Sequence, residues 1–194
     1  MEEFRKMPKN VSRETKSLKK PPSIQLFLDV SSTNTGVVIL KENNDVLLDN
    51  INLQQLSKPS CMKREDYEKI KIGVIKEYLD TLKKSYKIDR VYMEGIFIQP
   101  KFLKSSQMLL KLHGFLMGYF LDTHQYFISP SSIKKKITGK GNAKKEDVKR
   151  VIEEYYGVHF DNEDISDAFA IMICELGYQD FKIKEEKYGL RKSL

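Results

Sequence analysis

The stretch "SIQLFLDV", residues 23–30, decides the fold. Its apolar residues run almost without interruption, and its single charge, Asp29, stands near the C-terminal end. A short apolar run of this kind is typical of a central strand that is buried on both faces of a sheet. An acid inside such a strand is costly unless it has a partner. The stretch therefore predicts a core strand that carries Asp29 at its carboxyl end, near other polar groups.

The segments after this strand predict an α/β fold. After a turn in "SSTNTG", two apolar runs flank the "NNDV" turn, so the first three strands are expected to form an antiparallel meander. Apolar residues then recur with a helical period, and strands alternate with helices. The expected later elements are a helix over residues 67–82, a strand over 88–95, a helix over 104–124, a strand over 125–129, and helices over 143–156 and 163–176. This order predicts a mixed five-stranded sheet with helices on both faces.

Positive charge is concentrated in two segments. The 194-residue chain has a formal net charge of +7 and a pI near 9.2. Residues 1–22 contain seven Lys or Arg against three Glu, and residues 134–150 contain eight Lys or Arg against two acids. A localised basic surface is typical of a protein that binds a polyanion such as nucleic acid. A lysine-rich solvated surface has the same composition, so charge alone leaves both interpretations open.

The chain is expected to hold one folded domain over residues 23–178, preceded by a flexible basic arm over 1–22 and followed by a charged tail over 179–194. Its two cysteines, Cys61 and Cys174, lack metal-ligand spacing and indicate free thiols in a reducing cytoplasm. No apolar run approaches the ~18 residues of a membrane helix, and the N-terminal segment lacks the apolar core of a secretory signal. These features indicate a bacterial or archaeal cytoplasm, or that of a phage-infected host, and no membrane partner.

Four acids from three distant segments form the candidate site: Asp29, Glu94, Asp164 and Asp167. Working groups of open α/β sheets gather beyond the carboxyl ends of the strands, so these four carboxylates are expected to converge. Clustered acids repel one another unless cations neutralise them, which implies Mg²⁺ or Mn²⁺. Two such ions would clamp the attacking and leaving oxygens of a phosphodiester displacement. Each acid alone also fits a turn or a helix cap.

Residues 23–176 resemble the RuvC-type Holliday junction resolvases of the RNase H-like superfamily, especially the shorter phage and mobile-element relatives. The resemblance lies in "FLDVSSTNTGVVIL", "VYMEGIFI", "ISPSSIKKKITGKGNAKKEDV" and "DISDAFAI". It implies an RNase H-like fold, four-way junction DNA as the substrate, and two Mg²⁺ ions held by Asp29, Glu94, Asp164 and Asp167. It also implies a homodimer through the helix of residues 104–124. The Gly114 and Gly118 pair in that helix allows close packing, either against the sheet or against a second subunit.

The resemblance also assigns DNA contacts. Phe97, three positions after Glu94, would stack on bases at the opened crossover, although it could equally continue the core. Lys134 and Lys145 match the basic loop and the lysine that follows the "GxGxA" pattern, and Lys145 would stabilise charge on the scissile strand. The glycines of "TGKGNA" would let backbone N–H groups approach phosphates, with a simple loop as the alternative. Further DNA-binding candidates in this segment are Lys135, Lys136, Lys140, Asn142 and Lys144.

Together these observations predict a metal-dependent endodeoxyribonuclease that resolves four-way junctions by paired symmetric nicks, without a protein nucleophile. Two alternatives stay open: a nuclease of the same fold that cuts other branched DNA or RNA–DNA duplexes, and a non-catalytic junction-binding protein. "DVSSTNTG" is also similar to the phosphate loop of actin-like ATPases and sugar kinases, but the chain lacks their second glycine-rich motif. The histidines His113 and His124 are interpreted as structural.

Overall fold

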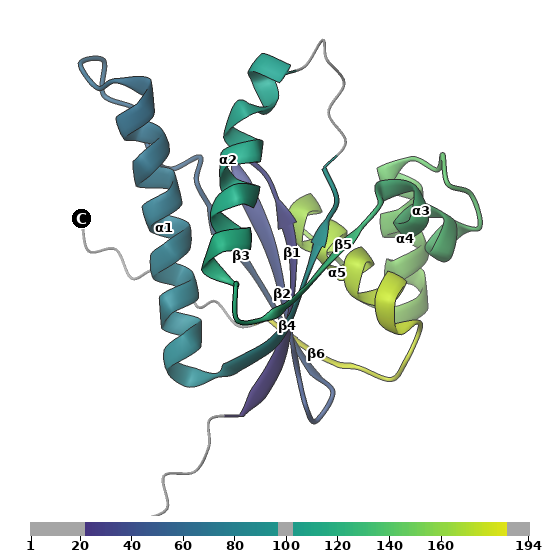
Figure 1. The fold of residues 1–194 in the computed structure, drawn as a ribbon. Helices are drawn as coiled ribbons and strands as arrows, with labels where there is room; N and C mark the ends of the chain where they lie inside the picture. The colour runs from purple at the N-terminus through teal and green to yellow at the C-terminus, as the bar shows by residue number, and fades with distance from the viewer. Residues whose placement is uncertain (1–21, 97–102, 186–194) are drawn as a thin grey trace, which may run out of the picture.

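A six-stranded sheet forms the centre of the computed structural model, which describes residues 22–96 and 103–185 (Figure 1). The strand order is β5-β4-β1-β2-β3-β6. The predicted antiparallel meander is confirmed, with β1 pairing β2 and β2 pairing β3. Its strands are β1 (Ser23–Val30), β2 (Asn34–Lys41) and β3 (Asp45–Asn52). The apolar run of residues 23–30 is therefore a central strand, as its burial on both faces requires.

The remaining strands pair in parallel, which makes the sheet mixed. β4 (Lys87–Glu94) lies between β1 and β5 (His124–Ile128), and both pairings are parallel. A helix joins β4 to β5, as expected for a parallel crossover. A short sixth strand, β6 (Lys182–Glu185), pairs in parallel with β3. The predicted number of five strands is thus corrected to six, and the extra strand lies in the segment that was predicted to be a tail.

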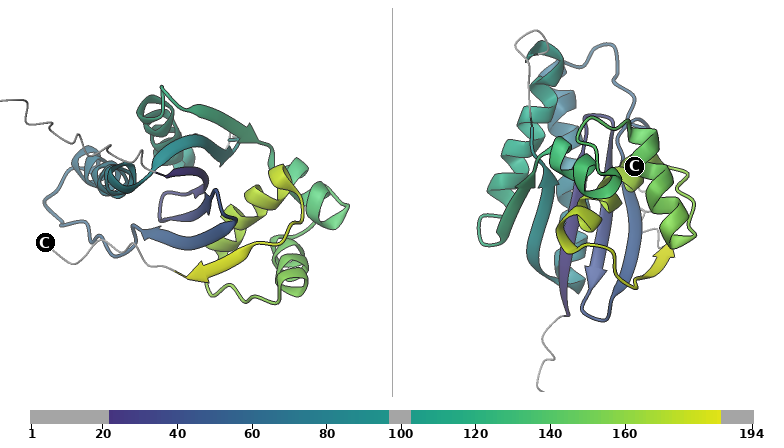
Figure 2. Two further views of the ribbon diagram at one scale, coloured as in Figure 1. Left: turned by 90° about the horizontal axis from the view of Figure 1, so that it is seen from below. Right: turned by 90° about the vertical axis from the view of Figure 1, so that its right-hand side faces the viewer.

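Helices cover both faces of the sheet, which confirms the predicted layers (Figures 1 and 2). α1 (Arg64–Ser85) and α2 (Leu103–Tyr119) pack on one face, and their apolar side chains form one core with the sheet residues that point toward them. The other face carries α3 (Pro130–Thr138), α4 (Lys145–Tyr156) and α5 (Glu163–Leu176), with a second core beneath them. None of the described helices is long and apolar enough to cross a membrane.

The helix α3 was missed because its sequence was interpreted as a basic loop. Its start is nevertheless well defined: Ser129 is the N-cap, its side chain accepts a hydrogen bond from the Ser132 backbone N–H, and Pro130 occupies the first turn. The helix ends at Gly139, whose φ of 77° is accessible to glycine without strain. Only two of its side chains, Ile133 and Ile137, are buried, so the apolar pattern is too short to separate the helix from a loop.

Candidate active site

Asp29 and Glu94 lie on the sheet face that α5 covers. Asp29 is the penultimate residue of β1, and Glu94 is the last residue of the neighbouring β4. Phe27 and its partner Tyr92 belong to the core beneath α5, and side chains alternate along a strand, so Asp29 and Glu94 share that face. The side chain of Asp29 is buried, with 7% relative exposure, and Glu94 is half-buried. The two carboxylates thus meet at the carboxyl end of adjacent parallel strands.

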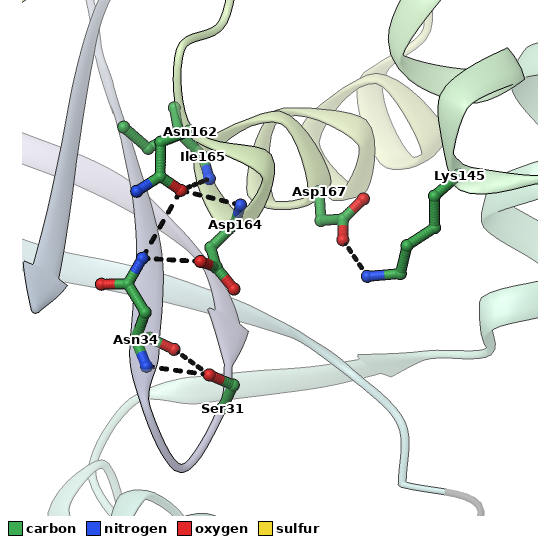
Figure 3. A network of polar contacts seen from close by, with 7 residues as sticks. All are labelled: Ser31, Asn34, Lys145, Asn162, Asp164, Ile165 and Asp167. Carbon is green, nitrogen blue, oxygen red and sulfur yellow. Dashed lines mark hydrogen bonds and ion pairs between the residues drawn. The ribbon is translucent and has the colours of Figure 1, made fainter. Parts of the chain in front are cut away.

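Asp164 and Asp167 lie in the first turns of α5 (Figure 3), and the charges of both act on Asp29. The N-cap of α5 is Asn162, whose Oδ1 accepts hydrogen bonds from the backbone N–H groups of Asp164 and Ile165 at 2.8 and 3.2 Å. The alternative that either aspartate is present to cap the helix is therefore wrong, because Asn162 performs this function. The side chain of Asp164 instead accepts a hydrogen bond from Asn34 of β2, and that of Asp167 is paired with Lys145 of α4 (Figure 3).

The carboxylates of this cluster influence one another strongly. Burial raises the pKa of Asp29 to about 8, and the negative charges of Asp167, Glu94 and Asp164 add to this effect. Burial also raises the pKa of Glu94 and of Asp167. Three neighbouring acids with raised pKa values indicate a site whose negative charge is not fully compensated by the protein. The structure thus brings Asp29, Glu94 and Asp167 close enough to influence one another, and the charge of Asp164 acts on Asp29.

Lys145 is a cation that contacts this cluster directly. It is the first residue of α4, and its ammonium group forms an ion pair and hydrogen bond with Oδ2 of Asp167 (Figure 3). Burial opposes its ionisation, but Asp167, Asp29 and Glu94 outweigh this and raise its pKa. Lys145 in turn lowers the pKa of all three acids. The lysine predicted from the "GxGxA" pattern thus lies inside the acidic site.

The donor set of the site fits a hard divalent cation, since it offers several carboxylate oxygens and no sulfur or imidazole. The burial of Asp29 beside other acids, which raises its pKa to about 8, is a further sign of this fit. Among residues 22–96 and 103–185, however, no three acidic, histidine or cysteine side chains surround one point closely enough to form a complete ion site. The site thus has oxygen ligands of the right kind, but in this structure these oxygens do not surround a single ion position.

The predicted DNA-binding residues are divided between the site and the outer surface. Lys134, half-buried on α3, lines a pocket with Glu94, Lys145 and Asp167, and its charge lowers the pKa of Glu94. Lys136 instead acts electrostatically on Cys174, in the last turns of α5. The remaining candidates are exposed: Lys135, Lys140, Asn142 and Lys144. Of the predicted DNA-binding residues, Lys134 and Lys145 therefore share a pocket with the acids of the site.

The predictions for the glycines and for His113 can be compared with the structure. Gly139 ends α3, and its backbone N–H donates to the Lys135 carbonyl, so this N–H is not available to a phosphate and the simple loop interpretation holds there. On α2, a Cβ atom at Gly114 or Gly118 would meet nothing within 4 Å, which excludes close packing of these glycines against the sheet. His113 is buried in α2, and burial lowers its pKa. Phe97 lies outside the described residues.

Sequence reasoning missed three residues that build the site. Asn34 donates a hydrogen bond from Nδ2 to Oδ2 of Asp164 at 2.6 Å, and Asn50 donates to Oδ1 of Asn34 at 3.1 Å. Gly36, the register partner of Asp29, allows the backbone of Asp164 to approach β2. The only signal in the sequence was the "TNTG" segment, which was interpreted as a simple turn, whereas β2 begins inside it at Asn34.

The chain is similar in sequence to known proteins of one family. A family model described as crossover junction endodeoxyribonuclease RuvC matches residues 26–175. A protein of this name from Ehrlichia ruminantium (strain Gardel) is 35% identical over 155 residues, which cover 77% of this chain and 93% of the relative. One from Campylobacter hominis is 30% identical over 156 residues, which cover 76% of this chain and 92% of the relative.

Solved structures show the same fold. Thermus thermophilus RuvC, in complex with a Holliday junction substrate, superposes with a TM-score of 0.58 at 15% identity. The structure described as Thermus thermophilus RuvC gives a TM-score of 0.57 at 17% identity. Each match covers 80% of this chain and 94% of the other. The predicted RNase H-like fold is confirmed.

Proposed function

Because the chain belongs to the RuvC family of crossover junction endodeoxyribonucleases, we propose that it resolves four-way DNA junctions as a metal-dependent endonuclease, by paired symmetric nicks. The observation that carries this proposal is the convergence of Asp29, Glu94 and Asp167 beside Lys145. Such a cluster is suited to phosphodiester hydrolysis, in which no side chain needs to act as the nucleophile. A protein that only binds junctions would have no need of buried, mutually repelling acids.

The metal is proposed to be Mg²⁺, with Mn²⁺ also supporting activity, and two ions per site. Asp29, Glu94, Asp164 and Asp167 would hold them. When bound, such ions polarise the phosphate, lower the pKa of a bound water and stabilise the leaving oxygen. Lys145 would be redirected from Asp167 toward the charge that develops on the scissile phosphate. Among the described residues Lys145 forms one ion pair, with Asp167, so this exchange breaks a single contact.

The DNA is proposed to lie across the carboxyl ends of β1 and β4 and over the basic segment of α3 and α4. Lys134 would contact the backbone close to the cut, because it lines the pocket that contains Glu94 and Asp167. The exposed candidates around it would contribute sequence-independent attraction to phosphates, a contribution that salt weakens. The same proposal extends to the following residues: Lys135, Lys136, Lys140, Asn142, Lys144 and, as a base-stacking side chain, Phe97.

A homodimer is proposed to form through α2. One stripe of this helix and the residues after it is exposed and apolar, with Leu110, Met117 and Leu121 exposed by 42, 49 and 79%. Gly114 and Gly118 lie in the same stripe with open space above them. Small residues flanked by exposed apolar side chains favour close contact with a second helix. Two copies joined here would carry two active sites, as paired nicks require.

The proposed setting is the cytoplasm of a bacterial or archaeal cell, or of a phage-infected host, and the relatives described above are bacterial. Residues 23–178 are proposed to form the nuclease domain. The basic segment of residues 1–22 is proposed to be an additional contact to DNA phosphates, because its charge is suited to them. The segment of residues 179–194 is proposed to serve the fold rather than the reaction, since β6 lies within it.

Cleavage of an end-labelled synthetic four-way junction tests the proposal. The protein should cut two opposing strands at symmetric positions in Mg²⁺, and cleavage should stop in EDTA. A linear duplex of the same length and sequence should stay intact. Equal cutting of the duplex, or preferential cutting of forks, flaps or RNA–DNA hybrids, would indicate the broader nuclease instead. Tight junction binding without cleavage in either Mg²⁺ or Mn²⁺ would indicate a non-catalytic protein.

A further inference from the structure

The carboxylate of Asp164 is bound by a neutral amide, whereas that of Asp167 is bound by an ammonium group (Figure 3). We propose that Asn34, supported by Asn50, is a positioning residue that orients Asp164 for metal binding. This inference rests on the proposed function, since it assumes that Asp164 is a ligand. Asn34 is 7% exposed and lies on the sheet face beneath α5. It is therefore a buried polar group whose hydrogen bonds must be satisfied by the site.

The orientation of each amide in this network follows from the one before it. Oδ1 of Asn162 accepts two backbone N–H groups of α5, and these donors leave no ambiguity about which atom is the oxygen. Asn34 must then present its NH₂ group to that side, where it lies 2.6 Å from Oδ2 of Asp164 and 3.5 Å from Oδ1 of Asn162. The oxygen of Asn34 is left to accept from Nδ2 of Asn50 at 3.1 Å. The three amides thus have one consistent arrangement.

The backbone that carries Asn34 is also held in place. Oγ of Ser31 accepts the backbone N–H of Asn34 at 2.9 Å, and it donates to the Asn34 carbonyl. On the other side of the turn, Nζ of Lys71 donates to the Ser32 carbonyl at 2.7 Å, which joins the turn to α1. Because both the backbone and the side-chain amide of Asn34 are held by hydrogen bonds, the amide restrains the Asp164 carboxylate that it binds. Asp164 is therefore oriented by β2, β3 and α1 together.

The neutrality of Asn34 has a chemical consequence. An ammonium partner must be displaced, or must share the carboxylate, when a divalent cation binds. An amide donor on Oδ2 restrains the carboxylate without cancelling its charge, so the second oxygen stays available to a cation. Partners of this kind around metal ligands typically contribute ~10–100-fold to metal affinity or activity. Asn34 would accordingly favour ion binding by holding Asp164 in one orientation before the ion arrives.

The substitution Asn34→Leu removes the donor and acceptor at nearly constant side-chain size. The substitution Asn50→Leu leaves the bond to Asp164 intact and removes only the support behind it. The matched control is Asn52→Ala, because Asn52 is the register partner of Asn34 but is exposed. Thermal unfolding in EDTA reports the structural cost of each substitution separately from its effect on the ion.

The deciding measurement is the affinity of the DNA-free protein for Mn²⁺ by titration calorimetry, together with the Mg²⁺ concentration that gives half-maximal junction cleavage. Asn34→Leu should weaken Mn²⁺ binding and raise the required Mg²⁺ by ~10–100-fold, with partial rescue at high Mg²⁺. Asn50→Leu should weaken Mn²⁺ binding and raise the required Mg²⁺ by a smaller factor. If Asn34→Leu does not fold, the Mn²⁺ affinity of Asn50→Leu tests the role of Asn34. Asn52→Ala should match the wild type.

An unchanged Mn²⁺ affinity in a folded Asn34→Leu protein would overturn the inference, even if its melting temperature fell. The same holds if Asn52→Ala weakens Mn²⁺ binding as much as Asn34→Leu does. If the wild type binds Mn²⁺ but cuts no junction, the proposed function fails, while the Mn²⁺ comparison still decides the role of Asn34.

Discussion

Gly36 of β2 lies directly against the backbone of Asp164 in the first turn of α5. A Cβ atom at position 36 would stand 1.8 Å from the Asp164 carbonyl oxygen. Gly36 is also the register partner of Asp29. The absence of a side chain at this position therefore allows α5 to approach the sheet at the level of Asp29. The distance between the acids of the strand and those of the helix depends on one glycine.

Replacement of Gly36 by Ala should damage both stability and activity. The clash is with backbone, so no side-chain rotation relieves it and α5 must move. Overpacking of this kind costs typically ~1–3 kcal/mol of unfolding free energy, occasionally more. The matched control is Gly73→Ala in α1, where a Cβ meets nothing within 4 Å and alanine is the better helix former. Urea unfolding and junction cleavage check both variants, and equal behaviour of the two would contradict the packing argument.

The stability of the ion-free protein should depend on the protonation of Asp29. Its pKa rises from 3.8 to about 8 on folding, so the folded state binds this proton more tightly than the unfolded chain does. The unfolding free energy should therefore fall as pH rises across this range, by at most about 1.4 kcal/mol per pH unit from this group, and then level off. Asn at position 29 cannot ionise, so Asp29→Asn should be more stable than wild type at pH 8, and the difference should shrink toward pH 4.

Urea unfolding in EDTA between pH 4 and pH 8 measures this difference directly. A difference between Asp29→Asn and wild type that stays constant over this range would contradict the burial of an ionisable Asp29. The same variant should lose junction cleavage while it still binds the junction, because the substitution removes a proposed ligand and leaves the basic surface unchanged.

Removal of the charge of Lys145 should slow cleavage and shift its pH dependence. Lys145→Gln removes the donor that we propose turns toward the reacting phosphate, and loss of such a donor typically costs roughly a hundredfold or more. It also removes the cation that lowers the pKa of Asp167, Asp29 and Glu94, so a higher pH should be needed to ionise the site. Single-turnover cleavage rates against pH measure both effects.

The neighbouring residue Lys144 supplies the control for this experiment. Lys144 is exposed and carries the same charge, but it makes no contact with the acids that the structure records among the described residues. Lys144→Gln should weaken junction binding slightly and leave the pH profile unchanged. Identical pH profiles for Lys144→Gln and Lys145→Gln would remove Lys145 from the proposed role.

A charge in the apolar stripe of α2 should prevent self-association. Met117 is 49% exposed, so Met117→Glu leaves the monomer core intact. The buried glutamates in the dimer would lack partners, which is costly. Light scattering after size exclusion should show wild type as a dimer and the variant as a monomer, with Glu77→Gln on α1 as an exposed control that stays dimeric. A dimeric Met117→Glu protein would place the interface elsewhere.

The sequence predicted the first five strands well because their signals are local. The single charge in "SIQLFLDV" identified Asp29, and the residues of β1 and α5 were predicted with their observed bounds. The short elements α3 and β6 bury few side chains of their own, so their apolar patterns are weak. Their boundaries depend on capping and on pairing with distant strands, which no local pattern contains.

The polar support of the site could not be predicted for a related reason. Asn34 and Asn50 are ordinary turn and strand-end residues in sequence, and they become important only because β2 and β3 place them beside α5. The close approach at Gly36 likewise joins segments more than a hundred residues apart. A general rule for α/β sheets was enough to predict that the acids would lie near one another. The positions of Asn34 and Asn50 depend instead on how α5 packs against β2 and β3, which no general rule gives.

The short strand β6 also bears on how the protein behaves in crowded solution. It covers the outer edge of β3, where the backbone of Asp45 to Leu48 would otherwise present open hydrogen-bonding groups. An uncovered edge of this kind invites strand addition from another molecule. A chain shortened after α5 would keep every proposed catalytic residue and yet become prone to aggregate. β6 becomes the edge of the sheet in place of β3, and its four residues, two of them lysines, make it a poor template for strand addition.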